Sequence, residues 1–172
     1  MTGHPQEYVI LGLLMKEDRH GYEIHRYFSS GLGHLWHAGI SNIYALLKHL
    51  EITGEVIPKI EIQDNRPAKK IYSITPGGRE TFLNWVHGPV EKIRDLRLEF
   101  LAKLFFMREL KLSGIGELIA KQIKVCQRQL EAVRQKDEVS RDELDRLVFQ
   151  FKIYQIEAIL MWLQVCDTYL NH

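Results

Sequence analysis

The first half of the chain alternates short amphipathic segments with glycine-containing turns. Apolar residues recur at helical spacing in residues 5–15, 22–30 and 40–53. Residues three and four positions apart share one face of a helix, so each segment predicts a helix with one buried side. Gly31 and Gly54 follow the second and third segments, as expected where helices end. Three short helices with a turn between the second and third predict a helix-turn-helix.

After the third helix the spacing changes from helical to alternating. Apolar and polar residues alternate in residues 56–62 and again in residues 69–75, with a polar turn at residues 63–68 between them. Alternation of this kind predicts two strands. Pro58 has no backbone N–H to donate, so we expect the first strand at an edge of the sheet. A hairpin directly after a third helix predicts the wing of a winged helix.

Capping residues indicate where three of the helices begin. Ser41 is a plausible cap of the third helix, since a serine hydroxyl accepts from the first free N–H groups. Thr75 followed by Pro76 predicts the start of a fourth helix, which we expect to run to about Val86. The run Ser140-Arg-Asp-Glu143 has the pattern of a capping box and predicts the start of the last helix.

The second half of the chain is helical throughout. From Val90 onward there is no further proline, and we expect helices at residues 93–110, 113–136 and from 140 nearly to the end. The middle helix has apolar residues 119, 123, 126, 130 and 133 at alternating spacings of four and three, as in coiled coils.

The last helix is apolar over so much of its circumference that one helix hairpin cannot cover it. A second copy of the chain is the simplest cover, so we expect a homodimer. The residues expected at its interface are Ile123, Leu130, Ile156, Leu160 and Leu163.

These elements predict a mainly α protein of two domains. Residues 1–88 are expected to form a winged helix-turn-helix domain with a two-stranded wing, and residues 89–172 an all-helical dimerisation domain.

The composition indicates the compartment of the protein but does not identify a binding partner. The chain has 23 Lys plus Arg and 22 Asp plus Glu, so its net charge does not indicate nucleic-acid binding. Two cysteines give no disulfide framework, and no secretion signal is evident, so we expect a cytoplasmic protein. The most apolar stretch, residues 153–170, is interrupted by polar and acidic residues, so we expect no membrane span.

The order of several short motifs resembles the PadR family of bacterial transcriptional regulators. Tyr8-Val-Ile-Leu-Gly-Leu-Leu14 and His20-Gly-Tyr-Glu-Ile24 resemble its first two helices, and the run from Ile43 to Gly54 resembles its recognition helix. The run from Arg66 to Arg79 resembles the wing and the following helix start. Residues 99–106 and 157–163 resemble the C-terminal domain of the longer members.

Two positions depart from the family pattern. Ala45 stands where the family often has proline, and Glu55 stands where it usually has an apolar residue. The second departure leaves open how the first strand of the wing joins the core. The resemblance implies a dimeric regulator, often a repressor released by a small aromatic acid or drug.

The polar side of the third helix is the candidate surface for reading DNA bases. Its residues are Ser41, Asn42, Tyr44, Ala45, Lys48 and His49. Such a helix fits the major groove, where Asn pairs with adenine and Lys with guanine. The alternative is a solvated helix face. For Tyr44, a phosphate contact and a packing role stay equally open.

The wing offers a second candidate surface. Asn65, Arg66, Lys69 and Lys70 form a basic cluster at its tip, suited to phosphate or minor-groove contact. The alternative is a strand edge that charge protects from aggregation.

The sequence gives little indication of metal binding, of an effector pocket or of enzyme activity. His20, His25, His34 and His37 lack the spacing and the acidic partners of a zinc site, so we expect neither metal nor cofactor. Trp36, Trp85 and Trp162 could line an effector pocket, although aromatic residues at helical spacing are more often core. Hydrolase, kinase and nucleotide-binding motifs are missing, so we expect no enzyme activity.

The sequence therefore predicts a transcriptional regulator, chiefly a ligand-released repressor that binds an inverted repeat of double-stranded DNA as a homodimer. An activator of the same fold and a winged-helix module for protein–protein contact remain as alternatives.

Overall fold

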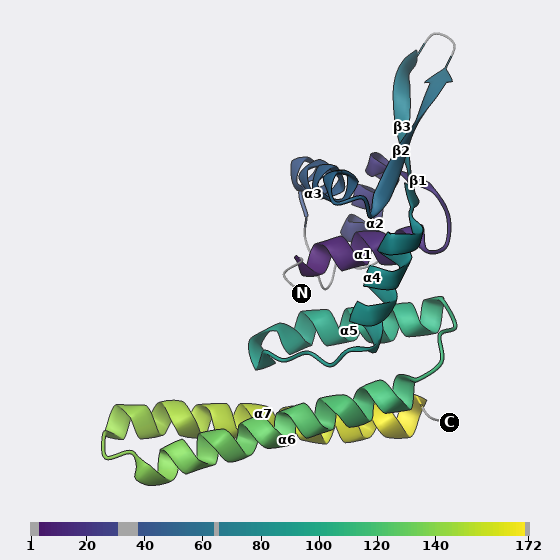
Figure 1. The fold of residues 1–172 in the computed structure, drawn as a ribbon. Helices are drawn as coiled ribbons and strands as arrows, with labels where there is room; N and C mark the ends of the chain where they lie inside the picture. The colour runs from purple at the N-terminus through teal and green to yellow at the C-terminus, as the bar shows by residue number, and fades with distance from the viewer. Residues whose placement is uncertain (1–3, 31–37, 64–65, 171–172) are drawn as a thin grey trace. The chain divides into compact units, whose positions relative to one another are not determined.

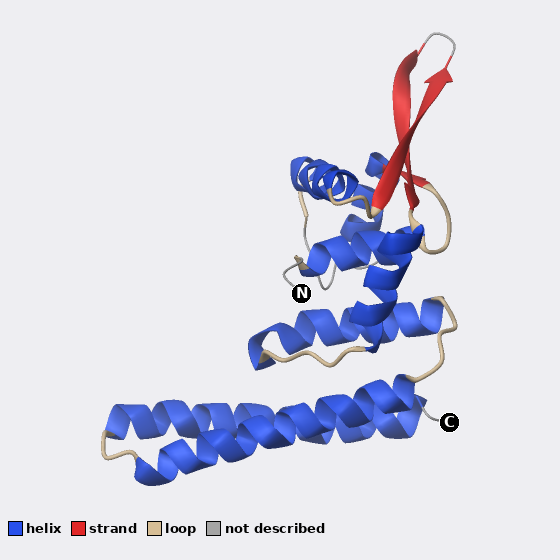
Figure 2. Ribbon diagram, viewed as in Figure 1, coloured by secondary structure: helices blue, strands red, loops and turns tan. Residues whose placement is uncertain are grey.

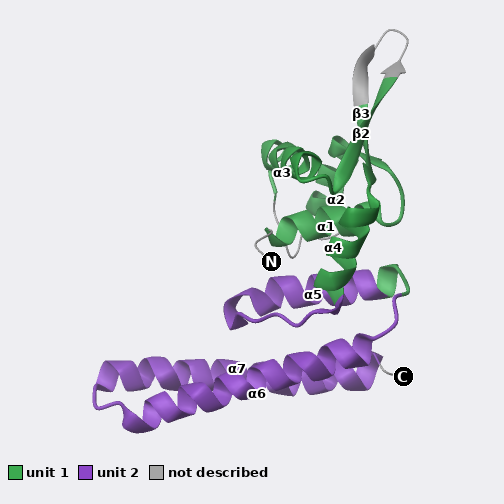
Figure 3. Cartoon of the chain, in the orientation of Figure 1, with its two compact units in different colours: residues 1–86, 108–111 green, residues 87–107, 112–172 purple. Residues whose placement is uncertain are grey.

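The computed structural model describes residues 4–30, 38–63 and 66–170, without the side chains of residues 30, 62, 63 and 66–69. The chain forms two compact units (Figure 3). The first consists of residues 1–86 together with 108–111, and the second of residues 87–107 and 112–172. Each unit is described by itself.

The first unit contains a helix-turn-helix core, as predicted. Its helices are α1 (Pro5–Leu14), α2 (Gly21–Ser30), α3 (Ile40–Ile52) and α4 (Pro76–His87, except its last residue) (Figure 1). Their apolar faces converge on a core in which Ile10, Ile24, Phe28 and Leu47 are completely buried. This burial of a stripe from each helix is the outcome that the helical spacing predicts.

A small antiparallel sheet completes the first unit (Figure 2). The strands β1 (Arg19–His20), β2 (Val56–Gln63) and β3 (Arg66–Ile74) are ordered β1-β3-β2. Pro58 therefore lies on an edge strand, as predicted. The two long strands form the predicted wing, but they continue closer to the turn than the alternation indicated. The strand β1 was not predicted, because two residues in a polar turn carry no alternation.

Helix caps agree with the sequence at one position and differ at two. The Gly78 N–H donates to Thr75 Oγ1 at 3.0 Å, which confirms Thr75 as the cap of α4. Ser41 does not cap α3: the cap is Gly39, which has no side chain to bond with. The last helix is capped by Asp142, whose Oδ1 accepts from the Asp145 N–H at 2.9 Å, and not by Ser140.

Glu55 joins the wing to the core through its backbone. Its carbonyl accepts from the Thr75 N–H at 3.0 Å, and its carboxylate accepts from Thr53 Oγ1 at 2.8 Å. The next residue, Val56, supplies the buried apolar side chain. A Cβ on Gly78 would lie 2.2 Å from the Glu55 carbonyl oxygen, so this close approach requires glycine. A polar residue at position 55 is therefore compatible with a well-packed wing.

The second unit is helical, as predicted. It contains α5 (Ile93–Glu109, except its last two residues), α6 (Ile115–Val139) and α7 (Glu143–Leu170). Helices α6 and α7 form an antiparallel hairpin and pack against each other along their length (Figure 1). No helix in the described part of the chain is long and apolar enough to cross a membrane.

The residues expected at a dimer interface lie mostly inside a single chain. Leu130, Ile156 and Leu163 are buried, with 8%, 3% and 0% of their surface exposed, and Ile123 and Leu160 are half-buried. The periodicity correctly indicated that these positions are covered. Leu130, Ile156 and Leu163, however, are covered by other residues of the same chain. The dimer expectation therefore cannot rest on them.

A different stripe of α7 is exposed and apolar. It includes Leu144, Leu147, Val148, Phe151, Tyr154, Met161, Val165 and Tyr169, each at least 42% exposed. Positions 144, 147, 151, 154, 158, 161 and 165 are separated alternately by three and four residues, and Ala158 is also exposed. This is the spacing of a coiled-coil seam. We call these residues the α7 stripe.

Candidate nucleic-acid interface

Helix α3 buries one side and exposes the other. Ile43, Leu47 and Leu50 are at most 1% exposed and pack in the core. All six residues predicted to read DNA are exposed: Ser41, Asn42, Tyr44, Ala45, Lys48 and His49. The structure therefore places the six where a partner could reach them. Asn42 and His49 lie on one flank of this exposed side, Tyr44 lies on the other flank, and Ser41, Ala45 and Lys48 lie between the two.

One flank of α3 is bonded to α1. Asn42 Nδ2 donates to Gln6 Oε1 at 3.0 Å. His49 Nδ1 lies 2.7 Å from Glu7 Oε1, and the other oxygen of Glu7 accepts from the His4 N–H at 2.9 Å. Glu7 is 7% exposed, so the imidazole is one of few partners for a nearly buried carboxylate. His49 therefore fastens α3 to α1.

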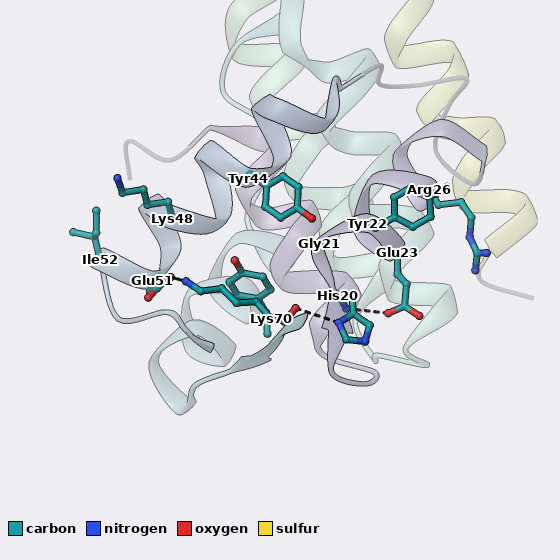
Figure 4. Close-up of a pocket in the computed structure, with 11 residues that line it drawn as sticks. His20, Gly21, Tyr22, Glu23, Arg26, Tyr44, Lys48, Glu51, Ile52 and Lys70 are labelled. Carbon is teal, nitrogen blue, oxygen red and sulfur yellow. Dashed lines mark hydrogen bonds and ion pairs between the residues drawn. The ribbon is translucent and has the colours of Figure 1, made fainter. Parts of the chain in front are cut away.

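The other flank of α3 borders a hollow of about 1140 Å³. Side chains from the start of α2, from α3 and from the adjoining strands surround it (Figure 4). The lining residues are His20, Gly21, Tyr22, Glu23, Arg26, Tyr44, Lys48, Glu51, Ile52, Lys70 and Tyr72. We call it the α3–wing hollow. It brings together Tyr44, Lys48 and Lys70 of the predicted residues.

Tyr44 packs against the first residue of α2. A Cβ on Gly21 would lie 2.6 Å from Tyr44 Cε1 and 3.2 Å from its hydroxyl oxygen, so only glycine admits the ring in this position. Tyr44 nevertheless remains 45% exposed. The two interpretations of Tyr44 are thus compatible, because its ring packs on Gly21 while the residue lines the hollow (Figure 4).

Charges of both signs line the hollow. Lys70 Nζ lies 3.5 Å from Glu51 Oε2, and Glu23 Oε2 accepts from the His20 N–H at 2.9 Å. Burial raises the pKa of Tyr72, and the nearby Glu51 carboxylate raises it further. The Tyr72 phenol therefore stays protonated and able to donate. An anion in the hollow would be attracted by the ammonium groups and could accept hydrogen bonds from the phenols. The Glu51 carboxylate would repel it.

The rest of the predicted wing cluster is placed only in part. Arg66 and Lys69 lie on β3, where Lys69 pairs with Glu61 and Arg66 with Gln63 in the strand register. Lys70 is opposite Ile60 and exposed. Asn65 lies outside the described residues.

Sequence reasoning missed several lining residues of the hollow, notably His20, Tyr22, Arg26, Glu51 and Tyr72. Tyr22 and Arg26 are four residues apart, away from the buried Ile24 and Phe28, and this spacing could have marked an exposed cationic face on α2. His20 comes from β1, whose pairing with β3 leaves no local signal. Only the fold brings it beside Lys70, where its Nδ1 lies 3.2 Å from the carbonyl.

The other candidate chemistry gains no support. The described residues hold no group of three His, Cys, Asp or Glu side chains that could bind a metal ion. His34, His37 and Trp36 lie outside the described residues. Trp85 stacks on Tyr8 with ring centroids 5.0 Å apart and 4% exposure, so it belongs to the core.

Trp162 and the two cysteines belong to the second unit. Trp162 packs edge-on against Phe100, with ring centroids 6.0 Å apart, and lines a hollow of about 700 Å³ between α5 and α7. Burial raises the pKa of both Cys126 and Cys166, which disfavours the reactive thiolate form of each.

Three stacked helices, an exposed face on the third and a wing beside it define a winged helix-turn-helix protein, here joined to a helical C-terminal unit. Residues 10–84 match the family model described as "Transcriptional regulator PadR-like family", and residues 96–171 match "Virulence activator alpha C-term".

The chain is also similar to one curated relative and to two solved structures. The chain is 35% identical over 127 residues to the "Negative transcriptional regulator PadR" of Bacillus subtilis, covering 72% of this chain and 68% of that one. A crystal structure of B. subtilis PadR with operator DNA covers 94% of this chain and 97% of its own, at 29% identity and a TM-score of 0.47. Another, with p-coumaric acid, covers 98% and 100%, at 27% identity and a TM-score of 0.43. The chain belongs to the PadR-like family, and it is a transcriptional regulator, not an enzyme.

Proposed function

We propose that the chain binds operator DNA in a sequence-specific manner as a homodimer and represses transcription until a small aromatic effector releases it. The observation that carries the DNA-binding part is the exposed side of α3, which borders a hollow containing Lys48, Lys70 and Arg26 next to the wing. Side chains in the major groove read the bases, and nearby cationic side chains bind the phosphates. The exposed side of α3 and the cations of the hollow would supply these two kinds of contact.

The geometry suggests how each part would be used. Ser41, Ala45 and Lys48 lie along the middle of the exposed side of α3 and would face base edges in the major groove. The wing would follow the adjacent minor groove. The sugar–phosphate strand between the two grooves would then pass the α3–wing hollow, where the Lys70 ammonium and the Tyr44 phenol can bond to phosphate. A phosphate of the DNA would then replace the Glu51 carboxylate as the partner of the Lys70 ammonium.

The homodimer is supported by the α7 stripe. A stripe of large apolar residues with coiled-coil spacing along one 28-residue helix is costly to leave in water. A second copy offers the same stripe, and an isologous pair buries both at once. Ala158 lies midway between Leu147 and Tyr169, so two antiparallel copies of α7 can approach closely there. We expect an interface above about 2,000 Å², as is typical of obligate dimers.

Repression and the effector rest on the relationship to the B. subtilis regulator. That protein is named a negative regulator and has been crystallised with p-coumaric acid. We therefore expect an aromatic carboxylate to weaken operator binding here. Titration of p-coumaric acid into the protein–operator complex tests this part separately. Unchanged affinity up to millimolar acid would refute this choice of effector and leave the DNA-binding proposal standing.

DNA binding itself is tested by selecting bound sequences from random double-stranded DNA with the full-length protein. An enriched inverted repeat with half-sites about 34 Å apart is the expected result. The Lys48→Ala variant should enrich a more degenerate half-site. If the wild-type protein enriches no sequence and retards no DNA fragment at low salt, the proposal fails and the protein-interaction alternative takes its place.

A second candidate function is activation. The helical unit matches the C-terminal model of a virulence activator, which favours this sign of regulation. A reporter gene behind the selected operator separates the two. Deletion of the regulator should raise expression if it represses and lower expression if it activates.

A further inference from the structure

The middle of the exposed side of α3 ends in an isoleucine. Positions along this middle line are separated by four, three and four residues, and they hold Ser41, Ala45, Lys48 and Ile52. Side chains at this spacing lie on one side of a helix. Ile52 is 73% exposed, whereas Leu50 of the same helix is 1% exposed. Ile52 therefore belongs to the side of α3 that faces a partner and not to the core.

The last turn of α3 holds Ile52 in place. The Thr53 N–H donates to the His49 carbonyl at 2.9 Å, so the turn that contains Ile52 is closed. A β-branched side chain on a helix has one strongly preferred rotamer, and it therefore loses little freedom when it makes a contact. Ile52 and Lys48 both line the α3–wing hollow and project from neighbouring turns of the helix (Figure 4). An apolar side chain thus stands ready beside a cationic one.

The major groove of DNA offers an apolar side chain one distinctive partner. Thymine carries its C5 methyl group there, whereas the other groups that distinguish the base pairs are hydrogen-bond donors and acceptors. Ile52 has no atom that could bond to those polar groups. Ala45 is a second apolar side chain on the same line, and Lys48 lies between the two. The line therefore presents two apolar groups to the bases with one cation between them.

Helical geometry gives the distance between the two apolar side chains. Ala45 and Ile52 are seven residues apart, which corresponds to about 10.5 Å along the helix axis. Successive base pairs are separated by about 3.4 Å. A helix lying along the groove would therefore present Ala45 and Ile52 to base pairs about three steps apart.

We propose that Ile52 is a specificity-determining residue that contacts a thymine methyl group in each half-site, and that Ala45 contacts a second thymine about three base pairs away. This inference rests on the proposed function and adds to it the bases that α3 selects. The contact removes apolar surface of both partners from water. Replacing thymine by another base withdraws the methyl group and leaves Ile52 beside polar groups that it cannot bond.

The experiment removes one methyl group at a time from the DNA. The full-length wild type is measured on its selected operator and on copies in which one thymine of a half-site is replaced by uracil, which pairs identically but lacks the methyl group. We expect affinity to fall about fourfold at two positions, the factor for withdrawing one methyl group from an apolar contact. Ile52→Ala should bind thymine and uracil equally, within about 1.5-fold, at one of these positions and keep the loss at the other.

The matched control is Ile57→Ala. Ile57 is an isoleucine of similar exposure, 60%, on β2, and it is not among the residues that line the hollow. This variant should keep the wild-type loss at both thymine positions. Comparing thymine with uracil within each protein cancels any general effect of a substitution on stability or on DNA affinity.

A wild type that binds its operator but loses no affinity with uracil at any position would overturn the inference. An Ile52→Ala protein that keeps both uracil effects would overturn it as well, and each result leaves the proposed function intact. A wild type that binds no DNA would refute both. Should Ile52→Ala fail to fold, Ile52→Val takes its place, and the uracil effect at the same position should fall to about twofold. An undiminished effect in that variant would count against Ile52.

Discussion

Helices α3 and α7 each leave one long side exposed, and the chemistry of the two sides is opposite. The exposed side of α3 carries hydroxyl, amide, imidazole and ammonium groups, whereas that of α7 carries Leu147, Phe151, Met161 and other large apolar residues. A polar side with cations beside it is stable in water and attracts an anionic partner. An apolar side gains from any cover that excludes water. The contrast agrees with the different partners that we propose for the two helices, DNA for α3 and a second copy for α7.

The largest expected effect comes from placing a charge in the α7 stripe. Phe151 is 68% exposed in the single chain, so Phe151→Glu should leave the helix hairpin folded and prevent dimerisation. Light scattering should give a mass near 20 kDa, the single-chain value, in place of twice that. Operator affinity should fall at least a hundredfold, because one half-site alone binds weakly.

The control introduces a glutamate elsewhere on α7. Arg146→Glu changes an exposed position that is neither three nor four residues from any member of the stripe, and this variant should remain dimeric. Leu163 is unsuitable, since it is fully buried in the single chain and a charge there would unfold the hairpin. A dimeric Phe151→Glu protein would show that the α7 stripe faces solvent and would remove the contrast between the helices.

The second effect concerns the wing. Replacing Arg66, Lys69 and Lys70 by alanine should weaken binding to all sequences about equally, since phosphates carry no sequence information. If each cation releases one counterion equivalent, the slope of log K against log salt should fall by about 2.7.

Three exposed lysines of the second unit, Lys92, Lys121 and Lys124, provide the control. Their triple alanine variant removes equal charge and should keep the wild-type salt slope within about half a unit. Equal slopes for the wild type and the wing variant would mean that the wing cations do not touch phosphate.

The third effect separates the middle of the exposed side of α3 from its α1 flank. Lys48→Ala should relax preference at one operator position and cost roughly 1–3 kcal/mol on the preferred sequence. Asn42→Ala should cost less, because Asn42 is already bonded to Gln6. Competition binding against single-base operator variants measures both, and a larger effect at Asn42 would reverse the assignment.

The smallest effect on DNA binding is expected at His49. His49→Ala leaves the nearly buried Glu7 carboxylate without its imidazole partner, so the free energy of unfolding should fall by about 1–3 kcal/mol. Base preference should stay the same. Urea unfolding at pH 7 measures the first quantity. A stable variant with altered base preference would place His49 among the base-reading residues.

The sequence predicted the elements whose signals are local. Helical spacing, the alternation of the wing, Pro58 at an edge and Thr75 as a cap are properties of a few neighbouring residues. The strand β1 and the hollow were missed because they depend on pairing between residues about 50 positions apart, such as Arg19 with Tyr72.

The dimer residues show a different limit. The spacing of Leu130 and its neighbours indicated that one face of α6 is covered, and it is. Periodicity cannot say whether the covering surface belongs to the same chain or to another. A similar limit applies to Ser41 and Ser140, because each is a residue type that often caps helices. The cap of α3 is nevertheless Gly39, and the cap of α7 is Asp142, whose carboxylate accepts from the Asp145 N–H.

The last turn of α5 has a consequence for how the protein is made. Residues 108–111 belong to the first unit, and Glu109 forms an ion pair of 2.5 Å with Lys16. The end of α5 carries the colour of that unit in Figure 3. During synthesis the first unit therefore cannot be completed when Val86 leaves the ribosome. It must wait for about 25 more residues, at a few seconds for typical elongation rates. The first unit can thus be completed only after α5 has been synthesised, and a chain cut after residue 88 would lack part of its own N-terminal unit.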